Sequence, residues 1–296
     1  ITSGNIRHSY SGLVKKYGPE LGKAVYLEGV AAREDLFRFI DDERIDCDFQ
    51  RCGRFTGAMN AEIFAGMAKE ADVVRRDLGI DTQLVERSAQ TDELGSDLYH
   101  GGIIRDDIGG VHPAKLHRGL LNVAKAAGAV VLGRTPVEGI RRDGNRFEVA
   151  TPKGRISAGD VVVATNGYTD GGLPWLRRRV VPVISEMIAT APLSPNLMRV
   201  LMPKGRMCGE SRHIGHYYRP SPDGTRILLG GRRYADDKSQ AIARLKRGLV
   251  EIFPDLTDVA LDHHWFGFVA FPMDELPKLA MHDGVHYAAG FCGSGV

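Results

Sequence analysis

The chain has 296 residues, of which 43% are apolar and 26% are charged, and its formal net charge at pH 7 is +2. This length and composition are ordinary for a globular protein with a sizeable core, and they leave room for two intertwined domains. The balanced charge excludes the strongly basic pattern of proteins that bind nucleic acid or a membrane surface, and no apolar run is long enough for a transmembrane helix.

Three helices are predicted in the first part of the chain. An apolar stripe at helical spacing predicts a long helix over residues 19–45. Asn60 is a good N-cap for a second helix, which we expect to run through Leu78 and to end at Gly79. Pro113 suits the first turn of a third helix, over residues 114–127. Short strands are expected at residues 49–56 and 130–132.

A β meander is predicted next. Its strands, over residues 137–141, 146–149 and 155–157, are separated by Asp143-Gly144 and Lys153-Gly154, which are good hairpin turns. The meander leads into residues 160–167, an apolar run that ends in small polar residues. Such a run is typical of a strand that is buried on both faces of a parallel sheet.

The second half of the chain has a different content of predicted elements, most of which are strands. We expect a β-rich stretch over residues 180–190, a hairpin around Asp223-Gly224 and an amphipathic helix over residues 239–253. The hairpin strands are 217–220 and 226–231, and later strands are 265–269 and 285–289. Because no repeat or linker separates these segments, we expect two interleaved domains.

Two glycine-containing clusters follow predicted buried strands. The first ends the strand over 160–167, at the edge where open α/β sheets bind ligands. The second has the spacing GxxGxG, which lets successive backbone N–H groups face an anion. Alone the GxxGxG spacing is weak, and a structural turn is the alternative; the two clusters together are more specific. Their candidate binding residues are Ala164, Thr165, Asn166, Gly167, Gly290, Gly293, Ser294 and Gly295.

The cysteines give no sign of a disulfide framework or a zinc site. Cys47, Cys52, Cys208 and Cys292 have no CxxC spacing and no histidine pair at a ligand interval beside them. We therefore expect reduced thiols, and hence a cytoplasmic protein without a metal site.

Several short sequences occur along nearly the whole chain in a recognisable order. They are His112-Pro113, Gly128-Ala129, Thr135-Pro136-Val137, Asp160–Gly167, Tyr217-Tyr218-Arg219-Pro220, Leu229-Gly230-Gly231-Arg232, Trp265-Phe266-Gly267, Asp274–Pro277 and Gly290–Val296. This order resembles the D-amino-acid-oxidase-like superfamily of FAD enzymes. The Tyr-Tyr-Arg-Pro and Gly-Gly-Arg pieces are most similar to the γ-glutamylputrescine oxidoreductase branch.

The resemblance implies a non-covalent FAD and a place for parts of it. Val137 would lie on the strand that meets the adenine, the turn at residues 164–167 against the ADP portion, and the turn at 290–295 near the ribityl chain and isoalloxazine. The family's first βαβ unit with GxGxxG, and the helix after the GxxGxG turn, are expected outside this chain. Since the GxGxxG helix would hold the pyrophosphate, we expect the chain alone to bind FAD weakly.

Two departures from the family pattern bear on the substrate and on the flavin. Val269 stands where α-amino-acid oxidases of the family carry an arginine for the substrate carboxylate, which favours an amine substrate or a carboxylate held elsewhere. Gly267 stands where members with covalent flavin carry a cysteine, and Cys292 is not at that position.

The substrate site is expected on the second domain. One residue of the pair Tyr217 and Tyr218 should face a cavity and the other the domain surface, because neighbours alternate along a strand. Arg232 could hold an anionic substrate group or the flavin; a surface ion pair with Asp236 or Asp237 is the alternative. His213 or His216 could tune the protonation of the amine, although both also suit a plain loop.

We therefore predict an α/β protein. An incomplete FAD-binding domain with a parallel sheet and β meander (residues 1–45, 105–175 and 262–296) interleaves with an α+β substrate domain built on a mixed sheet (46–104 and 176–261). The expected activity is FAD-dependent oxidation of a small primary or secondary amine, similar to γ-glutamylputrescine, to an imine. The alternatives are a D-amino-acid dehydrogenase or oxidase, and a non-catalytic fragment that binds no flavin. No nucleic acid or membrane partner is expected.

Overall fold

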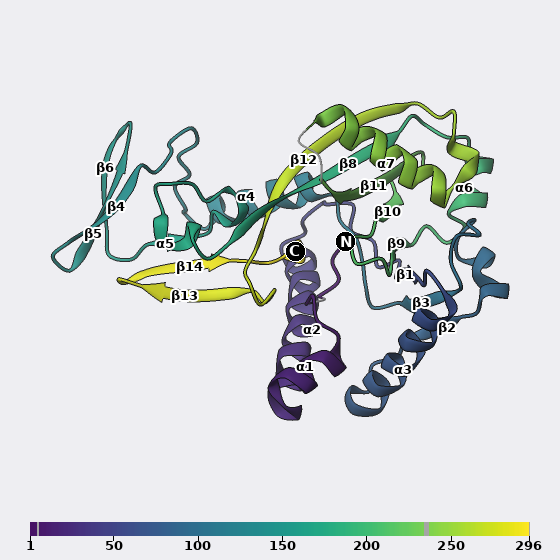
Figure 1. The fold of residues 1–296 in the computed structure, drawn as a ribbon. Helices are drawn as coiled ribbons and strands as arrows, with labels where there is room; N and C mark the ends of the chain where they lie inside the picture. The colour runs from purple at the N-terminus through teal and green to yellow at the C-terminus, as the bar shows by residue number, and fades with distance from the viewer. Residues whose placement is uncertain (5, 234–236, 296) are drawn as a thin grey trace. The chain divides into compact units, whose positions relative to one another are not determined.

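The computed structural model describes residues 1–4, 6–233 and 237–295. Its contacts group these residues into two compact units (Figure 1). The first unit consists of residues 1–119 and 185–267, and the second of residues 120–184 and 268–295. The chain passes between them within α4 (Pro113–Ala126), β8 (Val181–Thr190) and β12 (Leu261–Phe271). None of the described helices is long and apolar enough to span a membrane.

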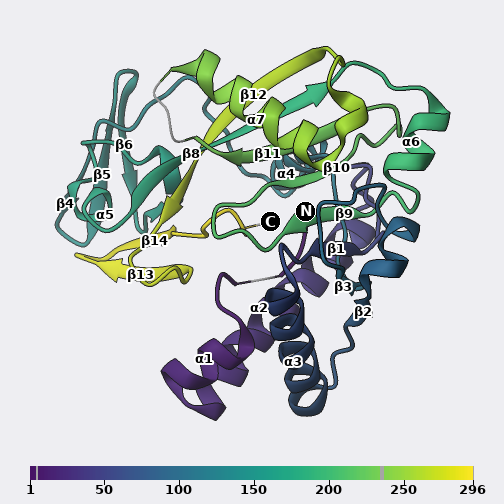
Figure 2. The same cartoon turned by 45° about the vertical axis from the view of Figure 1, so that its right-hand side comes forward.

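The first unit is built on one eight-stranded mixed sheet. The strand order is β12-β8-β11-β10-β9-β1-β3-β2, and β1 and β9 form a parallel pair. Figure 2 shows β9, β1, β3 and β2 following one another at one end of this sheet. The strands not yet given are β1 (Arg54–Gly57), β2 (Gln83–Val85), β3 (Gly102–Arg105), β9 (Met207–Glu210), β10 (Tyr217–Pro220) and β11 (Ile227–Arg232).

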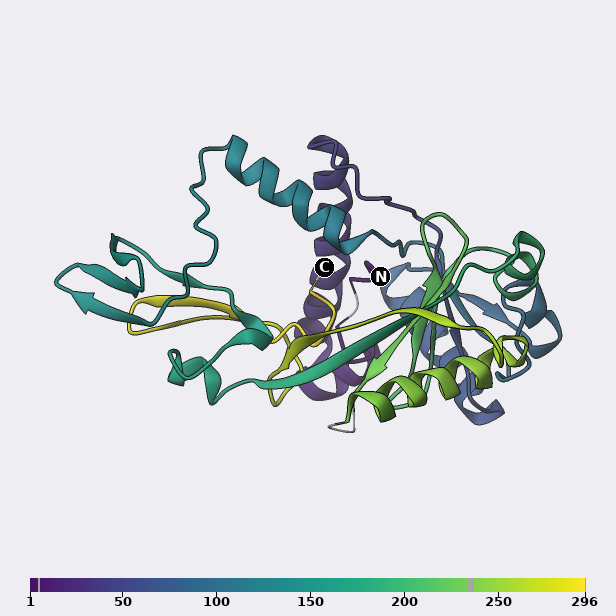
Figure 3. The same ribbon diagram turned by 90° about the horizontal axis from the view of Figure 1, so that it is seen from above.

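Helix α7 (Lys238–Ile252) covers one face of this sheet, as Figure 3 shows. Leu245 and Leu249 of α7 pack in one apolar core with Ile188, Tyr218 and Leu229 of the sheet. Because side chains alternate along each strand, the residues between these core positions lie on the opposite face. We call that opposite side the polar face.

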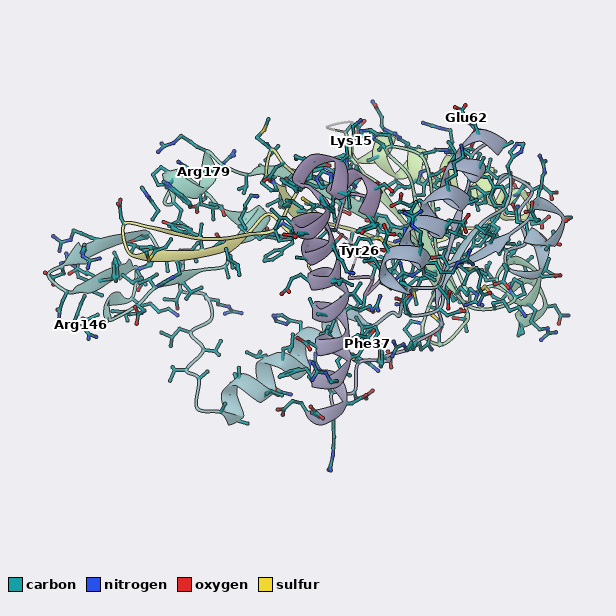
Figure 4. The ribbon with its side chains drawn as sticks, turned by 90° about the horizontal axis from the view of Figure 1, so that it is seen from below. Lys15, Tyr26, Phe37, Glu62, Arg146 and Arg179 are labelled. Carbon is teal, nitrogen blue, oxygen red and sulfur yellow. The ribbon has the colours of Figure 1, made fainter. Side chains whose placement is uncertain are left out.

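The helices before the sheet have clear capping signals. Asn60 Oδ1 accepts a hydrogen bond from Ile63 N at 2.8 Å, and Gly79 has a left-handed φ of 67°, so α3 (Ala61–Leu78) begins and ends where the sequence predicted. Helix α2 (Pro19–Asp42) packs against α1 (Tyr10–Tyr17). Figure 4 labels Tyr26 and Phe37 on α2.

The second unit holds two small sheets. One is the predicted meander of β4 (Gly139–Asp143), β5 (Arg146–Thr151) and β6 (Gly154–Ala158). The other has the order β13-β14-β7 and consists of β13 (Lys278–His282), β14 (Val285–Ala289) and β7 (Val162–Val163). Its core includes Val163, Tyr287 and Ala289, and Trp175 packs on Tyr287 with ring centroids 4.6 Å apart.

Some elements differ from the predictions. Residues 130–132 form no strand, and Val130 is 85% exposed, since this apolar run has no strand beside it in the second unit. The strand predicted over residues 160–167 is only β7, and Val162 is 67% exposed instead of buried on both faces. Val137 precedes β4 and is not part of a strand. The sequence analysis also missed α1, β2, β3, β9, β13 and two short helices, α5 (Pro174–Arg177) and α6 (Pro195–Leu201).

The two compact units divide the chain at other points than the predicted domains. Residues 1–45 and 105–119 belong with the eight-stranded sheet, whereas the prediction assigned them to cofactor binding. The predicted domains therefore remain a proposal about which segments serve the cofactor and which serve the substrate.

Candidate functional site

The two glycine-containing clusters begin at the same edge of the second unit's small sheet. Strands β7 and β14 are parallel, with Val162 opposite His286 and Val163 opposite Tyr287. Parallel strands end at one edge, so the turns that follow them lie side by side. Asn166 Oδ1 accepts a hydrogen bond from the Gly290 N–H at 2.9 Å and joins the two turns directly. We call residues 164–167 and 290–295 together the paired turns.

The paired turns depend on glycine for their backbone geometry. Gly290 and Gly293 have φ values of 79° and 82°, in the left-handed region that favours glycine. A Cβ at Gly290 would lie 2.9 Å from Pro272 Cδ, and one at Gly167 would lie 2.7 Å from the Phe268 carbonyl. Side chains at these positions are therefore excluded by strain or by contact.

The surface of the paired turns presents polar backbone groups. Ala164, Thr165, Gly293, Ser294 and Gly295 are exposed. Ser294 N–H donates to Phe291 O at 2.8 Å, whereas the N–H groups of Gly293 and Gly295 find no acceptor among the described residues. These two donors, on exposed glycines without side chains, suit a polar, anionic cofactor, and so the turns fit the flavin role that the resemblance implied for them. Val137 is half-exposed.

An apolar residue lies next to the second turn. A Cβ built at Gly293 would be 3.7 Å from Val269 Cγ1, so residue 269 faces the turn. Val269 is the residue that the resemblance predicts at the position of the carboxylate-binding arginine of α-amino-acid oxidases. A carboxylate next to this turn would have no cation from residue 269.

The polar face of the first unit places Tyr217 between two glycines. Five residues form one row across five strands: Met187, Gly230, Tyr217, Gly209 and Thr56. A Cβ at Gly230 would lie 2.3 Å from the Tyr217 ring, so the ring occupies the space next to the Gly230 backbone. The Tyr217 and Ser185 hydroxyls share a hydrogen bond. Burial raises the pKa of Tyr217, while the Ser185 hydrogen bond and the charge of Arg232 act in the opposite direction.

Tyr218 faces the α7 side of the sheet. It is 1% exposed, and its ring meets Phe253 edge to face with centroids 5.7 Å apart. The prediction that the second tyrosine lies on the domain surface is therefore wrong, because α7 covers that face. Its hydroxyl donates to Tyr99 Oη at 3.1 Å, and the Tyr99 hydroxyl donates to Glu210 Oε2 at 3.0 Å.

The hydrogen-bond chain continues from Glu210 to His216. Glu210 Oε1 accepts from the His216 backbone N–H at 2.9 Å and lies 3.0 Å from His216 Nδ1. A Cβ at Gly248 would be 2.5 Å from the His216 ring, so this histidine also lies under α7. His213 is exposed. We therefore infer that the His216–Glu210 contact holds the start of β10 in place, immediately before Tyr217.

Arg232 and Arg233 lie on opposite faces. Arg232 pairs with Ser185 in the β11–β8 register and therefore shares the polar face with Tyr217. Arg233 donates through Nε to Glu186 Oε1 at 2.7 Å, and Glu186 is 1% exposed. Of the two predicted acidic partners of Arg232, Asp237 caps α7 by accepting from Ser239 N at 2.8 Å. Asp236 lies outside the described residues.

The sequence analysis missed two residues of the polar face, Ser185 and Arg54. No sequence pattern pointed to Ser185, because its role depends on the register of β8 against β11. Arg54 lies on β1 with its side chain on the polar face, since Phe55 beside it is in the core under α7. Among the described residues, no cluster of His, Cys, Asp and Glu could hold a metal ion, and the four cysteines are free.

Comparison with known proteins gives a consistent picture. The family model of FAD-dependent oxidoreductases named DAO matches residues 2–296. The chain is 30% identical to a probable oxidoreductase OrdL of Rhizobium meliloti, over 94% of the chain and 65% of that protein. It is 29% identical to the γ-glutamylputrescine oxidoreductase of Escherichia coli, over 99% of the chain and 70% of that protein. The chain thus spans about two thirds of the length of these relatives.

Solved structures confirm the predicted fold class. The glycine oxidase of Geobacillus kaustophilus superposes with a TM-score of 0.77 at 20% identity, covering 90% of this chain and 74% of that one. The L-proline dehydrogenase of P. horikoshii gives a TM-score of 0.75 at 19% identity, covering 99% and 76%. At these identities the similarity establishes the fold alone.

Proposed function

Because the chain belongs to the DAO family of FAD-dependent oxidoreductases, as its sequence elements predicted, we propose that it oxidises a small primary or secondary amine to an imine. The substrate class that we favour is an amine with an anionic group away from the reacting nitrogen, as in γ-glutamylputrescine. FAD, when bound, accepts the hydride of this oxidation. The relatives at about 30% identity include a γ-glutamylputrescine oxidoreductase, which supports this class.

The observation that carries the proposal is the contrast between Val269 and the polar face. Val269 offers no charge beside the turn at Gly293, so an α-carboxylate next to this turn would have no cation from residue 269. Arg232, by contrast, shares the polar face with Tyr217 and acts on its pKa. We therefore favour a substrate whose anionic group meets a cation other than residue 269 over an α-amino acid that depends on a cation there.

The polar face also suits the needs of amine oxidation. Hydride transfer from an amine carbon needs a positioned, neutral amine more than it needs a strong base. The Tyr217 ring lies against Gly230 and its hydroxyl is hydrogen-bonded to Ser185, so it can act as a rigid wall for an aliphatic substrate. Tyr218 is buried in the core, so we assign it to support of this wall.

The test is a substrate screen on the flavin-loaded enzyme produced from the full-length gene. Anaerobic bleaching of the flavin absorbance would be recorded with γ-glutamylputrescine, sarcosine, glycine and a set of D-amino acids. We expect γ-glutamylputrescine or another ω-anionic amine to reduce the flavin fastest. Faster reduction by D-amino acids would favour the D-amino-acid dehydrogenase alternative, and a purified protein without yellow colour would favour a non-catalytic chain.

A further inference from the structure

Arg54 is a cation on the polar face whose charge nothing in the described chain neutralises. None of its guanidinium nitrogens has a hydrogen-bond acceptor or a carboxylate partner among the described residues, and its Nε is fully buried. Burial lowers the pKa of Arg54. A buried donor without a partner costs roughly 1–3 kcal/mol, and more when it is charged, so proteins rarely keep one without a use.

The guanidinium of Arg54 reaches toward the row that holds Tyr217. A Cβ built at Gly209 would lie 2.5 Å from Arg54 Nη2, so the guanidinium covers the Gly209 backbone. Gly209 is the direct neighbour of Tyr217 in the β9–β10 register. Arg54 therefore borders one side of Tyr217, while Ser185 holds the tyrosine hydroxyl on the other side.

The neighbours of Arg54 add positive charge instead of removing it. Arg105 lies directly opposite Arg54 in the β1–β3 register. Arg105 is satisfied: its Nε donates to Asp107 Oδ1 at 2.8 Å and its Nη1 to the Tyr26 hydroxyl at 3.1 Å (Tyr26 is labelled in Figure 4). Asp107 also pairs with Arg33, at 2.7 Å, and among the described residues it makes no ion pair with Arg54.

A second incompletely satisfied arginine lies on the same face. Arg219 is 9% exposed; its Nη1 donates to Val111 O and its Nε to Pro220 O, both at 3.0 Å, but its Nη2 has no partner. Continuing the β9–β10 register places Arg219 opposite Met207, which is in turn opposite Arg54. With strands about 4.8 Å apart, the two arginines start roughly 10 Å from each other on one face. Two arginines, each with a buried guanidinium nitrogen that has no partner among the described residues, thus lie on this part of the polar face.

We propose that Arg54 binds a carboxylate of the substrate beside Tyr217. The proposal rests on the amine oxidation proposed above and names the group that the enzyme would recognise. The guanidinium presents parallel N–H donors that match the two oxygens of a carboxylate, and it holds its charge at every working pH. Arg232 then lies on the far side of Tyr217, where it serves the proposed site from a different strand.

The expected stability of an Arg54 variant distinguishes a binding role from a structural role. Since Arg54 has no partner to lose among the described residues, Arg54→Met removes an uncompensated charge and leaves no unpaired acid behind in that part of the chain. The melting temperature of Arg54→Met should therefore equal or exceed that of the parent. Replacement of an arginine with a structural role, such as Arg105, should lower the melting temperature of the protein.

The deciding measurement is the affinity of the flavin-loaded, full-length enzyme for glutarate and for its uncharged diamide, by isothermal titration calorimetry. Loss of a charge-assisted contact predicts a Kd for glutarate about 10- to 100-fold higher in Arg54→Met, with little change for the diamide. Arg54→Lys keeps the charge without the planar fork and should fall between the parent and Arg54→Met. Arg105→Met removes a nearby charge that is already paired, so it is the matched control and should leave the glutarate Kd within about 3-fold of the parent.

Unchanged glutarate binding in Arg54→Met, or an equal loss in Arg105→Met, would overturn the inference. The outcome is separable from that of the proposed function, because binding is measured without turnover. If amines reduce the flavin but Arg54→Met binds glutarate normally, only the proposed role of Arg54 is refuted. If no amine reduces the flavin but glutarate binding depends on Arg54, the amine oxidation falls and the carboxylate site stands.

Discussion

Asn166 and Gly290 are joined by a hydrogen bond of 2.9 Å from the Gly290 N–H to the Asn166 side-chain oxygen, although 124 residues separate them in the chain. Asn166 itself has a φ of 45°, a conformation that asparagine tolerates better than most residues. One residue thus meets two needs of the paired turns: a left-handed backbone and an acceptor for the neighbouring turn.

Replacing Asn166 tests this junction. Asn166→Ala loses the acceptor and places alanine in the left-handed region, so we expect a loss of about 2 kcal/mol in the free energy of unfolding. Asn166→Asp keeps an acceptor in the same place and should lose much less. Urea unfolding of the three proteins gives the comparison, and equal losses in both variants would show that the junction contributes nothing.

Replacing Gly293 tests the cofactor role of the paired turns. Its φ of 82° strains any other residue, and its N–H lies on an exposed edge. In the flavin-loaded enzyme, Gly293→Val should lower the flavin-to-protein absorbance ratio well before it lowers the melting temperature of the apoprotein. The same prediction holds for Gly295→Val.

Gly171 provides a control for the Gly293 variant. It is exposed in the same unit, and no atom lies within 4 Å of a Cβ built there. Gly171→Val should leave the flavin content unchanged. Parent-like flavin content in Gly293→Val would mean that the turn is only structural.

The attachment of the flavin can be tested by denaturation. Because Gly267 stands where covalent members of the family carry a cysteine, we expect non-covalent FAD. Acid or heat precipitation of the flavin-loaded enzyme should leave the yellow colour in the supernatant. Colour that stays with the pellet would contradict this prediction.

Arg232 is predicted to contribute to the binding of an anionic substrate. A lost charge-assisted hydrogen bond costs about 1.5–3 kcal/mol, so Arg232→Met should lower kcat/KM roughly 10- to 100-fold for an anionic amine. A neutral amine of similar size should be affected much less. Equal, weak effects on both substrates would indicate that Arg232 serves only a surface contact.

Arg233 is the matched control for Arg232, because it is the next residue but lies on the other face. Its loss would leave Glu186, which is 1% exposed, with the His264 contact at 3.3 Å as its one remaining side-chain partner among the described residues. We expect Arg233→Met to reduce the free energy of unfolding by about 3 kcal/mol. It should not discriminate between anionic and neutral amines in kinetic assays.

Glu210 makes the stability of the protein depend on pH in the acid range. Burial alone would raise its pKa, but the hydrogen bonds from His216 and the charge of Arg212 outweigh burial and place the pKa below the usual 4.5. A carboxyl with a depressed pKa stabilises the fold above its unfolded-state pKa and loses that contribution as the pH falls through the folded-state pKa. Stability should therefore decline as the pH falls below about 4.5.

The variant Glu210→Gln isolates this effect. It removes the titrating group, so its stability at pH 7 should be lower than the parent's and its decline below pH 4.5 less steep. Urea unfolding at several pH values between pH 3 and pH 7 measures both. Parallel pH profiles in the two proteins would show that other carboxyls dominate.

The sequence by itself determined the local elements and the family. Asn60 and Gly79 set both ends of α3, and Asp223-Gly224 set the hairpin of β10 and β11, because caps and tight turns depend on a few adjacent residues. The order of short motifs indicated the DAO family, which the family model confirms over residues 2–296. These features involve contacts that are near in sequence, or patterns that the whole family shares.

Only the tertiary structure decided which side chains face the site. Alternation along β10 predicts that Tyr217 and Tyr218 point to opposite faces, but it does not say which face is covered; the packing of α7 on Tyr218 decides this. Likewise, no sequence pattern shows that Arg54 lies directly opposite Arg105, which is far from it in the chain. Arg105 has an acid two residues along the chain, Asp107, which also pairs with Arg33 of α2, whereas Arg54 has no carboxylate partner among the described residues. The charge balance of a buried face is a sum over strands that are distant in sequence, so it exists only once they are assembled.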